Sequence, residues 1–388
     1  MFKGLTWDHP RGFNALDAAA KANPALGLIW NTHSLEGFET HPIADLCEQY
    51  DLVVLDHPHV GEAVGGDCLR PLEDIFTPEE IAGWARDCIG PSLKSYQFAD
   101  KHWALPLDAA TQVMACQPGI DIPQTWDEVL AFNGPVALSL AGPHAALSFQ
   151  SICAALGEHP AVKDPDLFVS EAVGLTALDI MQRLTDTSPL SVREKNPIGI
   201  LQHMVDRDDV VLCPLIYGYV NYAAPKAGKA LTFANAPRSA GGIGSTLGGT
   251  GIGISRRCDI TPELLDYLRW LMSPQAQIGF IPAHDGQPSL RVAWQDAAVN
   301  ARWGDFYRNT ADTLEAAYVR PRHDRAARRE RHHVPGPDAA SLEVGAGERA
   351  LPLSRDEPSG RAACRAGQGA ARRGGPGGLP RSQAAPAF

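Results

Sequence analysis

The sequence predicts an α/β protein of two lobes separated by a cleft, followed by a disordered C-terminal tail. Strand-like and helix-like segments alternate with short links over the first hundred residues, which is typical of right-handed βαβ units in a mostly parallel sheet. A second alternating region follows, and extended segments near residues 108–113 and 232–250 pass between the two regions. Residues 325–388 differ in composition from everything before them.

The elements of the first region follow from apolar patterning and helix-start signals. Residues 50–55 (YDLVVL) are apolar almost throughout, as expected of a strand buried on both faces. Thr77 suits an N-cap before Pro78 at the first helical position. We expect strands over residues 2–7, 25–30 and 50–55, helices over 14–22, 35–47 and 78–88, and a hairpin that turns at Ala99-Asp100 before a further extended run.

The second region has the same character, and the boundaries of the lobes follow from it. The motif TWDE starts a helix at residue 125, and the glycine-dense stretch 239–255 leads into a strand. Other strands are expected over 134–140, 208–219 and 229–237, and helices over 145–156, 165–184, 197–205, 262–272 and 274–280. One lobe would hold residues 1–108 and 245–290, and the other would hold residues 109–244 and 291–324.

The tail, residues 325–388, is dominated by Ala, Arg, Gly and Pro. It lacks Ile, Met, Tyr and Trp, so it cannot bury enough apolar surface to offset the entropy of ordering, and we predict disorder. It could be an arginine-rich arm for an anionic partner, or a non-native extension such as a reading-frame change in GC-rich DNA. On composition we favour the second interpretation.

Charge, hydropathy and cysteine spacing exclude several classes of protein. The net charge is −11, and because the tail carries eleven Arg against six acids, the first 324 residues carry −16. A body this acidic is a poor partner for nucleic acid. No apolar run approaches the roughly 20 residues that span a bilayer, so we expect no membrane insertion. The eight cysteines form no C-x-x-C pair, which favours free thiols over a disulfide framework or a zinc site.

Polar and aromatic residues recur just after the predicted strands, where ligands bind in open parallel sheets. Apolar ring faces combined with a few oriented polar groups suit a pocket for a small polar ligand. The run Asp56-His57-Pro58-His59 follows the third strand, and the candidate ligand-binding residues at the strand ends are Trp7, His9, His57, His59, Asp108, Tyr217, Tyr219 and Tyr222.

The same positions could also serve other chemistries. His57 and His59 are two apart and could reach one metal ion, with Asp8, His9 or Asp108 as further ligands. H-x-H alone lacks the spacing of a recognised zinc motif, so hydrogen bonding to a ligand is favoured, and no metal or cofactor is expected. The glycine-dense stretch lacks the Gly-Lys-Ser/Thr of a phosphate loop, and there is no G-x-S-x-G elbow at Ser245.

These segments together resemble the family 1 extracellular solute-binding proteins of ABC transporters, which have the type II periplasmic-binding fold. The resemblance covers about residues 1–324. It rests on the order of several segments along the chain and on their local sequence. These segments are YDLVVLDHPHVG, HWALPLDAATQVMAC, PQTWDEVLAF, DDVVLCPLIYGYVNY, GGTGIGIS and LLDYLRWLMSPQAQIGF.

The resemblance implies a receptor that closes over a small polar solute, often a sugar, and delivers it to an inner-membrane ABC permease. Gly249 and Thr250 would border the cleft beside the strand-end residues, and His284 with Gln287 would close it. A monomer is expected. The family implies a periplasmic location, whereas the first residues show no signal peptide, which would leave the protein in the cytoplasm.

Two alternatives stay open at this point. One is a cytoplasmic enzyme on the same fold, a lyase, transferase or cofactor-precursor synthase, in which a strand-end histidine acts as acid or base. The other is a cytoplasmic sensor that reports ligand occupancy to a partner protein.

Overall fold

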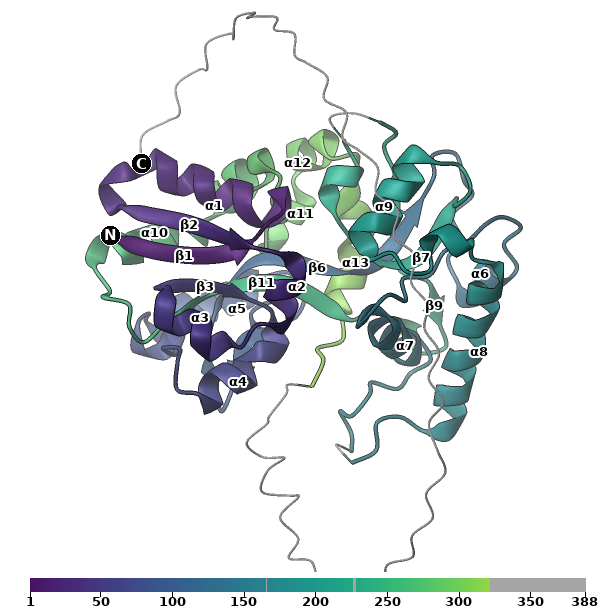
Figure 1. The fold of residues 1–388 in the computed structure, drawn as a ribbon, viewed down its shortest axis with the longest axis horizontal. Helices are drawn as coiled ribbons and strands as arrows, with labels where there is room; N and C mark the ends of the chain where they lie inside the picture. Colours follow the sequence, from purple (N-terminus) through teal and green to yellow (C-terminus); the bar gives the residue numbers. More distant parts are fainter. Residues whose placement is uncertain (165, 226–227, 322–388) are drawn as a thin grey trace, which may run out of the picture. The chain divides into compact units, whose positions relative to one another are not determined.

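The computed structural model describes residues 1–164, 166–225 and 228–321 of the chain (Figure 1). The prediction of disorder for residues 325–388 lies outside the described residues, as does Cys364. The other seven cysteines are free thiols, as expected. Within the described ranges, no helix combines the length and the apolar character needed to cross a bilayer.

One seven-stranded sheet organises the described chain, in the order β2-β1-β3-β11-β6-β7, with β8 also paired to β6. β1 lies parallel to both β2 and β3, as the alternating sequence predicts, whereas β11 runs antiparallel to β3 and to β6. The strands are β1 (Phe2–Trp7), β2 (Leu28–His33), β3 (Leu52–Leu55), β6 (Leu105–Cys116), β7 (Leu212–Tyr217), β8 (Thr232–Ala234) and β11 (Leu247–Ile254).

β6 is the strand that both halves of the sheet share. All twelve of its residues are buried. Its first part pairs with β11 as far as Thr111, and its second part, from Gln112, pairs with β7 and β8. This is the predicted crossing near residues 108–113. The exact boundaries of two lobes on either side of it stay a prediction.

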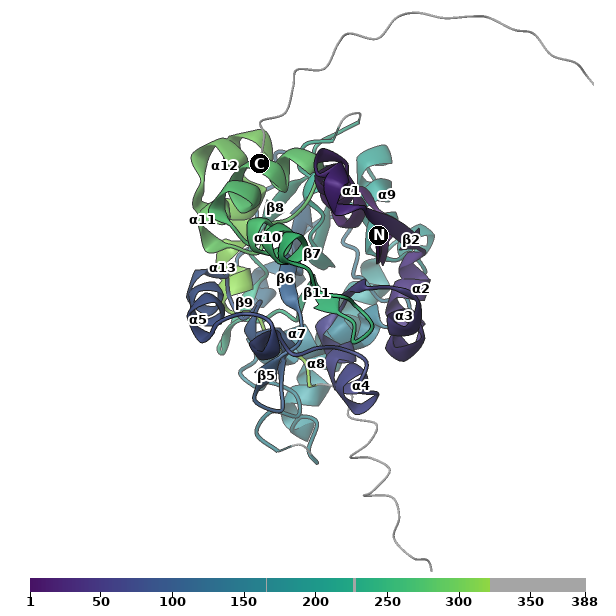
Figure 2. The same cartoon turned by 90° about the vertical axis from the view of Figure 1, so that its left-hand side faces the viewer.

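The alternation of side chains along β3 explains why its sequence is apolar throughout. Leu52 and Val54 belong to the largest hydrophobic cluster, together with α1 (Pro10–Ala22) and α10 (Pro262–Leu271). Val53 and Leu55 belong to another cluster, together with α3 (Ile43–Gln49) and α4 (Val60–Gly65). Helices therefore cover both faces of this part of the sheet, as Figures 1 and 2 show.

The predicted helix starts are confirmed by their caps. Thr77 accepts a hydrogen bond from the backbone of Glu80, whose carboxylate accepts one from the backbone of Thr77, and Thr125 forms the same box with Glu128. The remaining α-helices of the described residues are α2 (Leu35–Thr40), α5 (Pro78–Asp87), α6 (Trp126–Leu130), α7 (His144–Ala155), α8 (Glu171–Thr187), α9 (Pro197–Asp206), α11 (Arg291–Gln295), α12 (Ala297–Arg302) and α13 (Phe306–Glu315), and a π-helix spans Gln275–Phe280.

The hairpin predicted at Ala99-Asp100 is present as β4 (Gln97–Phe98) and β5 (Lys101–His102). Both turn residues have positive φ, which suits the tight connection. A second short ribbon joins β9 (Arg238–Ser239) to β10 (Gly242–Ile243).

Two expected elements differ from the structure. The helix expected over 35–47 is two helices, α2 and α3. Pro42 lacks an N–H and forces His41 before it into an extended conformation (φ −71°, ψ 134°), which ends α2. The strand expected over 134–140 makes only an isolated bridge, between Val136 and Leu212. The Val136 carbonyl accepts instead from the hydroxyl of Ser188, 2.8 Å away.

Gly249 supports the first testable prediction. Its φ is +89°, and a Cβ there would lie 2.3 Å from the backbone oxygen of Asp108 on β6. Replacing it by alanine should therefore lower the free energy of unfolding by at least about 2 kcal/mol. Gly279, where a Cβ meets nothing within 4 Å, gives the matched control. Urea unfolding of the two alanine variants measures the difference, and equal midpoints would contradict the constraint.

Candidate functional site

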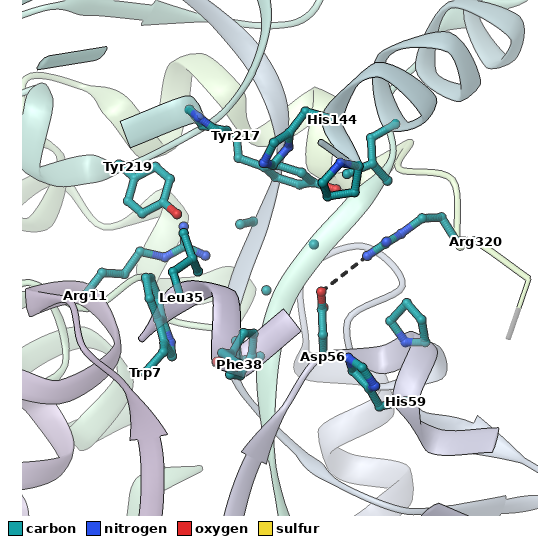
Figure 3. Close-up of a pocket in the computed structure, with 18 residues that line it drawn as sticks. Trp7, Arg11, Leu35, Phe38, Asp56, His59, His144, Tyr217, Tyr219 and Arg320 are labelled. Atoms are coloured by element: carbon teal, nitrogen blue, oxygen red, sulfur yellow. Dashed lines mark hydrogen bonds and ion pairs between the residues drawn. The ribbon is translucent and has the colours of Figure 1, made fainter. Parts of the chain in front are cut away.

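A cavity of about 380 Å³ opens at the strand ends of the sheet (Figure 3). One wall comes from the ends of β1 and β3 and from α1 and α2. The opposite wall comes from the end of β7, the start of α7 and the segment after α13, and β11 lies between them. The first wall carries Trp7, Arg11, Phe38, Asp56 and His59, and the second carries His144, Tyr217, Tyr219 and Arg320.

Aromatic rings make one end of the cavity apolar. Trp7 lies edge-on to Tyr219, with ring centroids 6.2 Å apart. The guanidinium of Arg11 lies over both rings, 4.9 Å from the Tyr219 centroid and 5.6 Å from the Trp7 centroid. Gly12 is required beside them because a Cβ there would collide with the Trp7 indole at 2.2 Å. Aromatic side chains at one end of a cavity suit the C–H surface of a ligand.

A buried ion pair holds Arg11 in place. Its Nε and Nη2 donate to the two carboxylate oxygens of Asp108 at 2.8 and 2.5 Å, and its Nη1 donates to the Gly218 carbonyl at 3.0 Å. Burial disfavours the guanidinium charge, but Asp108 beside it outweighs this and raises the pKa of Arg11. Both side chains are almost fully buried. The Arg11 side chain is therefore held in one position in the wall, and its positive charge is balanced by Asp108.

A second, looser ion pair spans the cavity between Asp56 and Arg320. Arg320 Nη2 lies 3.4 Å from Asp56 Oδ2 (Figure 3), and both side chains keep some solvent exposure. Among the described residues, Oδ1 of Asp56 and Nε of Arg320 have no hydrogen-bond partner. A buried acceptor and a buried donor without partners are costly unless a ligand or water satisfies them.

Two neutral polar groups add to the hydrogen-bonding capacity of the cavity. Nδ1 of His144 and Oγ1 of Thr250 also lack a hydrogen-bond partner within the part of the chain that the structure describes. Burial, with a smaller contribution from Arg320, lowers the pKa of His144 to about 4, so its imidazole is neutral at pH 7. The cavity thus offers charged and neutral hydrogen-bonding groups beside aromatic faces, which suits a hydroxyl-rich solute.

Arg320 reaches the cavity because the segment after α13 is anchored to the sheet. The backbone of Tyr318 donates to the Ser245 carbonyl at 2.7 Å and accepts from the Leu247 N–H at 2.8 Å. Its phenol donates to the Pro160 carbonyl at 2.6 Å. This attachment carries the chain from the end of α13 across to the strand-end side of the sheet.

The residues predicted from strand ends divide among three places. A second cavity of about 430 Å³ is lined by His9 and Tyr222. The ring of His9 stacks on Trp7 (centroids 5.1 Å apart, planes 7° apart) and meets Tyr219 edge-on, so this ring layer borders both cavities. The main cavity is lined by Trp7, His59, Tyr217, Tyr219, Gly249 and Thr250.

The other predicted residues line neither cavity. His57 is fully buried, with Nδ1 3.8 Å from Asp56 Oδ1, and Asp108 contacts Arg11. His284 contacts the carbonyl of Phe280 through Nδ1 at 2.9 Å.

Gln287 connects two elements beneath the cavity. Its amide donates to the Ala109 carbonyl at 3.1 Å, and its oxygen accepts from the Val220 N–H at 2.9 Å. It therefore joins β6 to the turn after β7.

The described residues hold no group of three or more His, Cys, Asp or Glu side chains placed to share a metal ion.

Sequence reasoning missed several residues of the cavity. Arg11 stands one turn beyond the β1 end, so extending the strand-end search by a few residues would have found it. Asp56 belongs to the run Asp56-His57-Pro58-His59 that the sequence places at the end of the third strand, but only the two histidines of that run are named as candidates. His144 opens α7 after an irregular segment, and Arg320 has no local signal at all, because only the anchoring of Tyr318 brings it to the site.

Comparison with known proteins gives a result at the level of structure alone. No family model matches the sequence, and no curated protein matches it. An ABC-transporter solute-binding protein of Agrobacterium radiobacter K84 in complex with ribitol superposes with a TM-score of 0.67 at 20% identity, covering 83% of this chain and 88% of that one. The chain has the fold of the ABC-transporter solute-binding proteins.

Other solved structures with the solute-binding fold agree. Maltose-bound T. maritima MalE3 gives a TM-score of 0.66 at 14% identity, covering 84% of this chain and 90% of that one. A solute-binding protein of Agrobacterium vitis S4 with bound D-mannitol gives 0.62 at 15% identity, covering 83% and 86%. The resemblance read from the sequence is therefore confirmed for the fold.

We expect loss of Asp108 to be costly to stability. Asp108→Ala leaves the Arg11 guanidinium buried without a counter-charge and should lower the free energy of unfolding by about 3–5 kcal/mol. The double variant Arg11→Met/Asp108→Leu removes both charges and should recover most of that loss. Urea unfolding of both variants measures this. A single variant no less stable than the double variant would contradict the role of the pair.

The cap of α1 predicts a pH dependence. His9 Nδ1 accepts a hydrogen bond from the Arg11 N–H at 3.1 Å, and burial, followed by the charge of Arg11, lowers the pKa of His9 to about 4. The unfolded chain, with a histidine pKa near 6.5, then binds more protons between these values, so stability falls as pH drops through that window.

The variant His9→Asn keeps an N-cap acceptor and removes the titration. Between pH 7 and 4.5 the unmodified protein should lose on the order of 2 kcal/mol more unfolding free energy than this variant. Urea unfolding at both pH values measures the loss. The same loss in both proteins would show that His9 does not titrate as described.

Proposed function

We propose that this protein is the solute-binding component of an ABC transporter and that it binds a small, neutral, hydroxyl-rich solute, a sugar or sugar alcohol, in the main cavity. The observation that carries the proposal is the set of partnerless polar atoms around the cavity, Asp56 Oδ1, Arg320 Nε, His144 Nδ1 and Thr250 Oγ1, for which the described residues supply no hydrogen bond. Hydroxyl groups both donate and accept, so they can satisfy all four.

The charges of the walls favour a solute without net charge. Arg11 is matched by Asp108, and Arg320 is matched by Asp56. His144 is neutral at pH 7. Among the described lining residues, a charged solute would find no unmatched counter-charge for its own desolvated charge, whereas hydroxyl groups can join the Asp56–Arg320 pair at its open atoms.

The aromatic end supports the same class of solute. The aromatic side chains of Trp7 and Tyr219 lie on one side of the cavity, and the hydrogen-bonding groups Asp56, His144 and Arg320 lie on the others. Sugars and sugar alcohols carry C–H surfaces beside their hydroxyl groups. The solved structures with this fold include proteins with bound ribitol, maltose and D-mannitol. In this role the protein delivers its solute to an inner-membrane permease, and it acts outside the cytoplasm.

Calorimetry and thermal shift with ribitol, D-mannitol and maltose test the proposal. At least one of these should raise the unfolding midpoint, because a ligand that binds only the folded state stabilises it. Arg320→Met should weaken binding at least about tenfold, the equivalent of one lost charge-assisted hydrogen bond. Trp7→Ala should abolish the shift through loss of the ring face.

Arg256→Met is the matched control, because Arg256 pairs with Asp67 at 2.6 Å in an exposed position remote from the cavity lining. Its binding should equal that of the unmodified protein. Binding unchanged in Arg320→Met, or no shift with any neutral polyol or sugar while an anionic metabolite binds, would overturn the proposal. Turnover of a solute, lost on His59→Ala with binding retained, would favour the enzyme alternative.

A further inference from the structure

Cys47 and Cys68 lie on the face of β3 that α3 and α4 cover. Cys47 lies on α3 and is buried, and Cys68 follows α4 and is partly exposed. A Cβ on Gly66 would lie 3.8 Å from the Cβ of Ala44, which is one turn before Cys47 on the same face of α3. The segment after α4 therefore runs along the face of α3 that carries Cys47, and both cysteines belong to the same hydrophobic cluster.

The two thiols interact, and each is the largest influence on the pKa of the other. The Cys68 thiol is also 3.3 Å from the Ala63 carbonyl. The interaction lowers the pKa of Cys68, and it raises the pKa of Cys47. The accessible member of the pair is therefore the one that forms a thiolate more readily, and the thiolate is the reactive form.

The other described cysteines lack these properties. Each of them is buried, and burial raises its pKa, which makes a thiol inert toward oxidants. They are Cys88, Cys116, Cys153, Cys213 and Cys258.

In the sequence, Cys47 and Cys68 lie on either side of the segment that forms part of one wall of the main cavity. Between Cys47 and Cys68 the chain forms β3, then passes through Asp56 and His59, which line the cavity, and then forms α4. A covalent link between the two sulfurs would close this segment into a loop and tie the cavity wall to α3.

We propose that Cys47 and Cys68 are a redox-active pair that forms a reversible disulfide across the segment carrying Asp56 and His59. The site does not depend on the identity of the solute. Bond formation needs the sulfurs to close to about 2.0 Å, through side-chain rotation on α3 and on the irregular chain at Cys68.

The oxidant is a small-molecule or protein disulfide. The Cys68 thiolate attacks one sulfur of that disulfide, and the other sulfur leaves as a thiol after taking up a proton. Cys47 then loses its proton and attacks the Cys68 sulfur, which releases the second oxidant sulfur as a thiol. In total the protein gives up two electrons and two protons, and one external disulfide becomes two thiols.

Incubation of the full chain with oxidised glutathione tests the pair. The reduced chain has eight thiols. Thiol titration in denaturant should then find two fewer, the intact mass should fall by about 2 Da, and peptide mapping should join Cys47 to Cys68. Closure of the loop should raise the thermal midpoint by on the order of 5 °C, reversibly with dithiothreitol.

Cys47→Ala and Cys68→Ala should each abolish the loss of two thiols and the rise in midpoint. Cys258→Ala is the matched control, a buried cysteine outside the pair, and it should still lose two thiols. The proposal fails if oxidation joins Cys68 to Cys364 or another cysteine, or if the chain keeps all eight thiols under oxidant. Because these readouts involve no solute, they are separate from any failure of the solute-binding role.

Discussion

The guanidinium of Arg11 is the group on which the geometry of the site depends. It leaves the first turn of α1, forms two hydrogen bonds with Asp108 on β6, and donates a third to the Gly218 carbonyl just after β7. Three segments far apart in the sequence therefore meet at one buried charge. A planar group with fixed donors holds all three in a single arrangement, which a flexible lysine could not do as well. The rings of Trp7 and Tyr219 pack against the same guanidinium, so Arg11 also fixes the position of the aromatic end of the cavity.

The second ion pair differs from the first in a way that suits binding. Arg11 and Asp108 use both carboxylate oxygens and are almost fully buried. Asp56 and Arg320 make one longer contact across the cavity and keep open atoms on both sides. The first pair fixes the scaffold, and the second leaves hydrogen-bonding capacity at the site. Arg320 and Asp56 stand on opposite walls, so a solute that engages both would hold the walls together.

The strand pattern and the helix caps were predictable because they depend on local sequence. The apolar run of β3 reflects burial on both faces, and the boxes at Thr77 and Thr125 satisfy backbone groups within four residues. The strand expected over 134–140 was wrong because the hydroxyl groups of Ser148 on α7 and Ser188 at the end of α8 take up carbonyl groups of this segment, among them that of Val136. Local apolar content does not reveal such a competition.

By itself, the sequence determined the order of strands and helices, the solute-binding fold and the strand-end positions from which Trp7, His59, Tyr217 and Tyr219 reach one cavity. The order of elements and the strand-end positions follow from side-chain periodicity and from the rule that ligands bind beyond the carboxyl ends of strands, whereas the fold follows from the resemblance of the chain to the solute-binding proteins. Only the tertiary structure decided that Asp108 faces Arg11, that His57 is interior, and that Arg320 meets Asp56. The reason is physical: which of several polar groups at an edge points into the cavity depends on long-range packing, and that leaves no mark on the residues nearby.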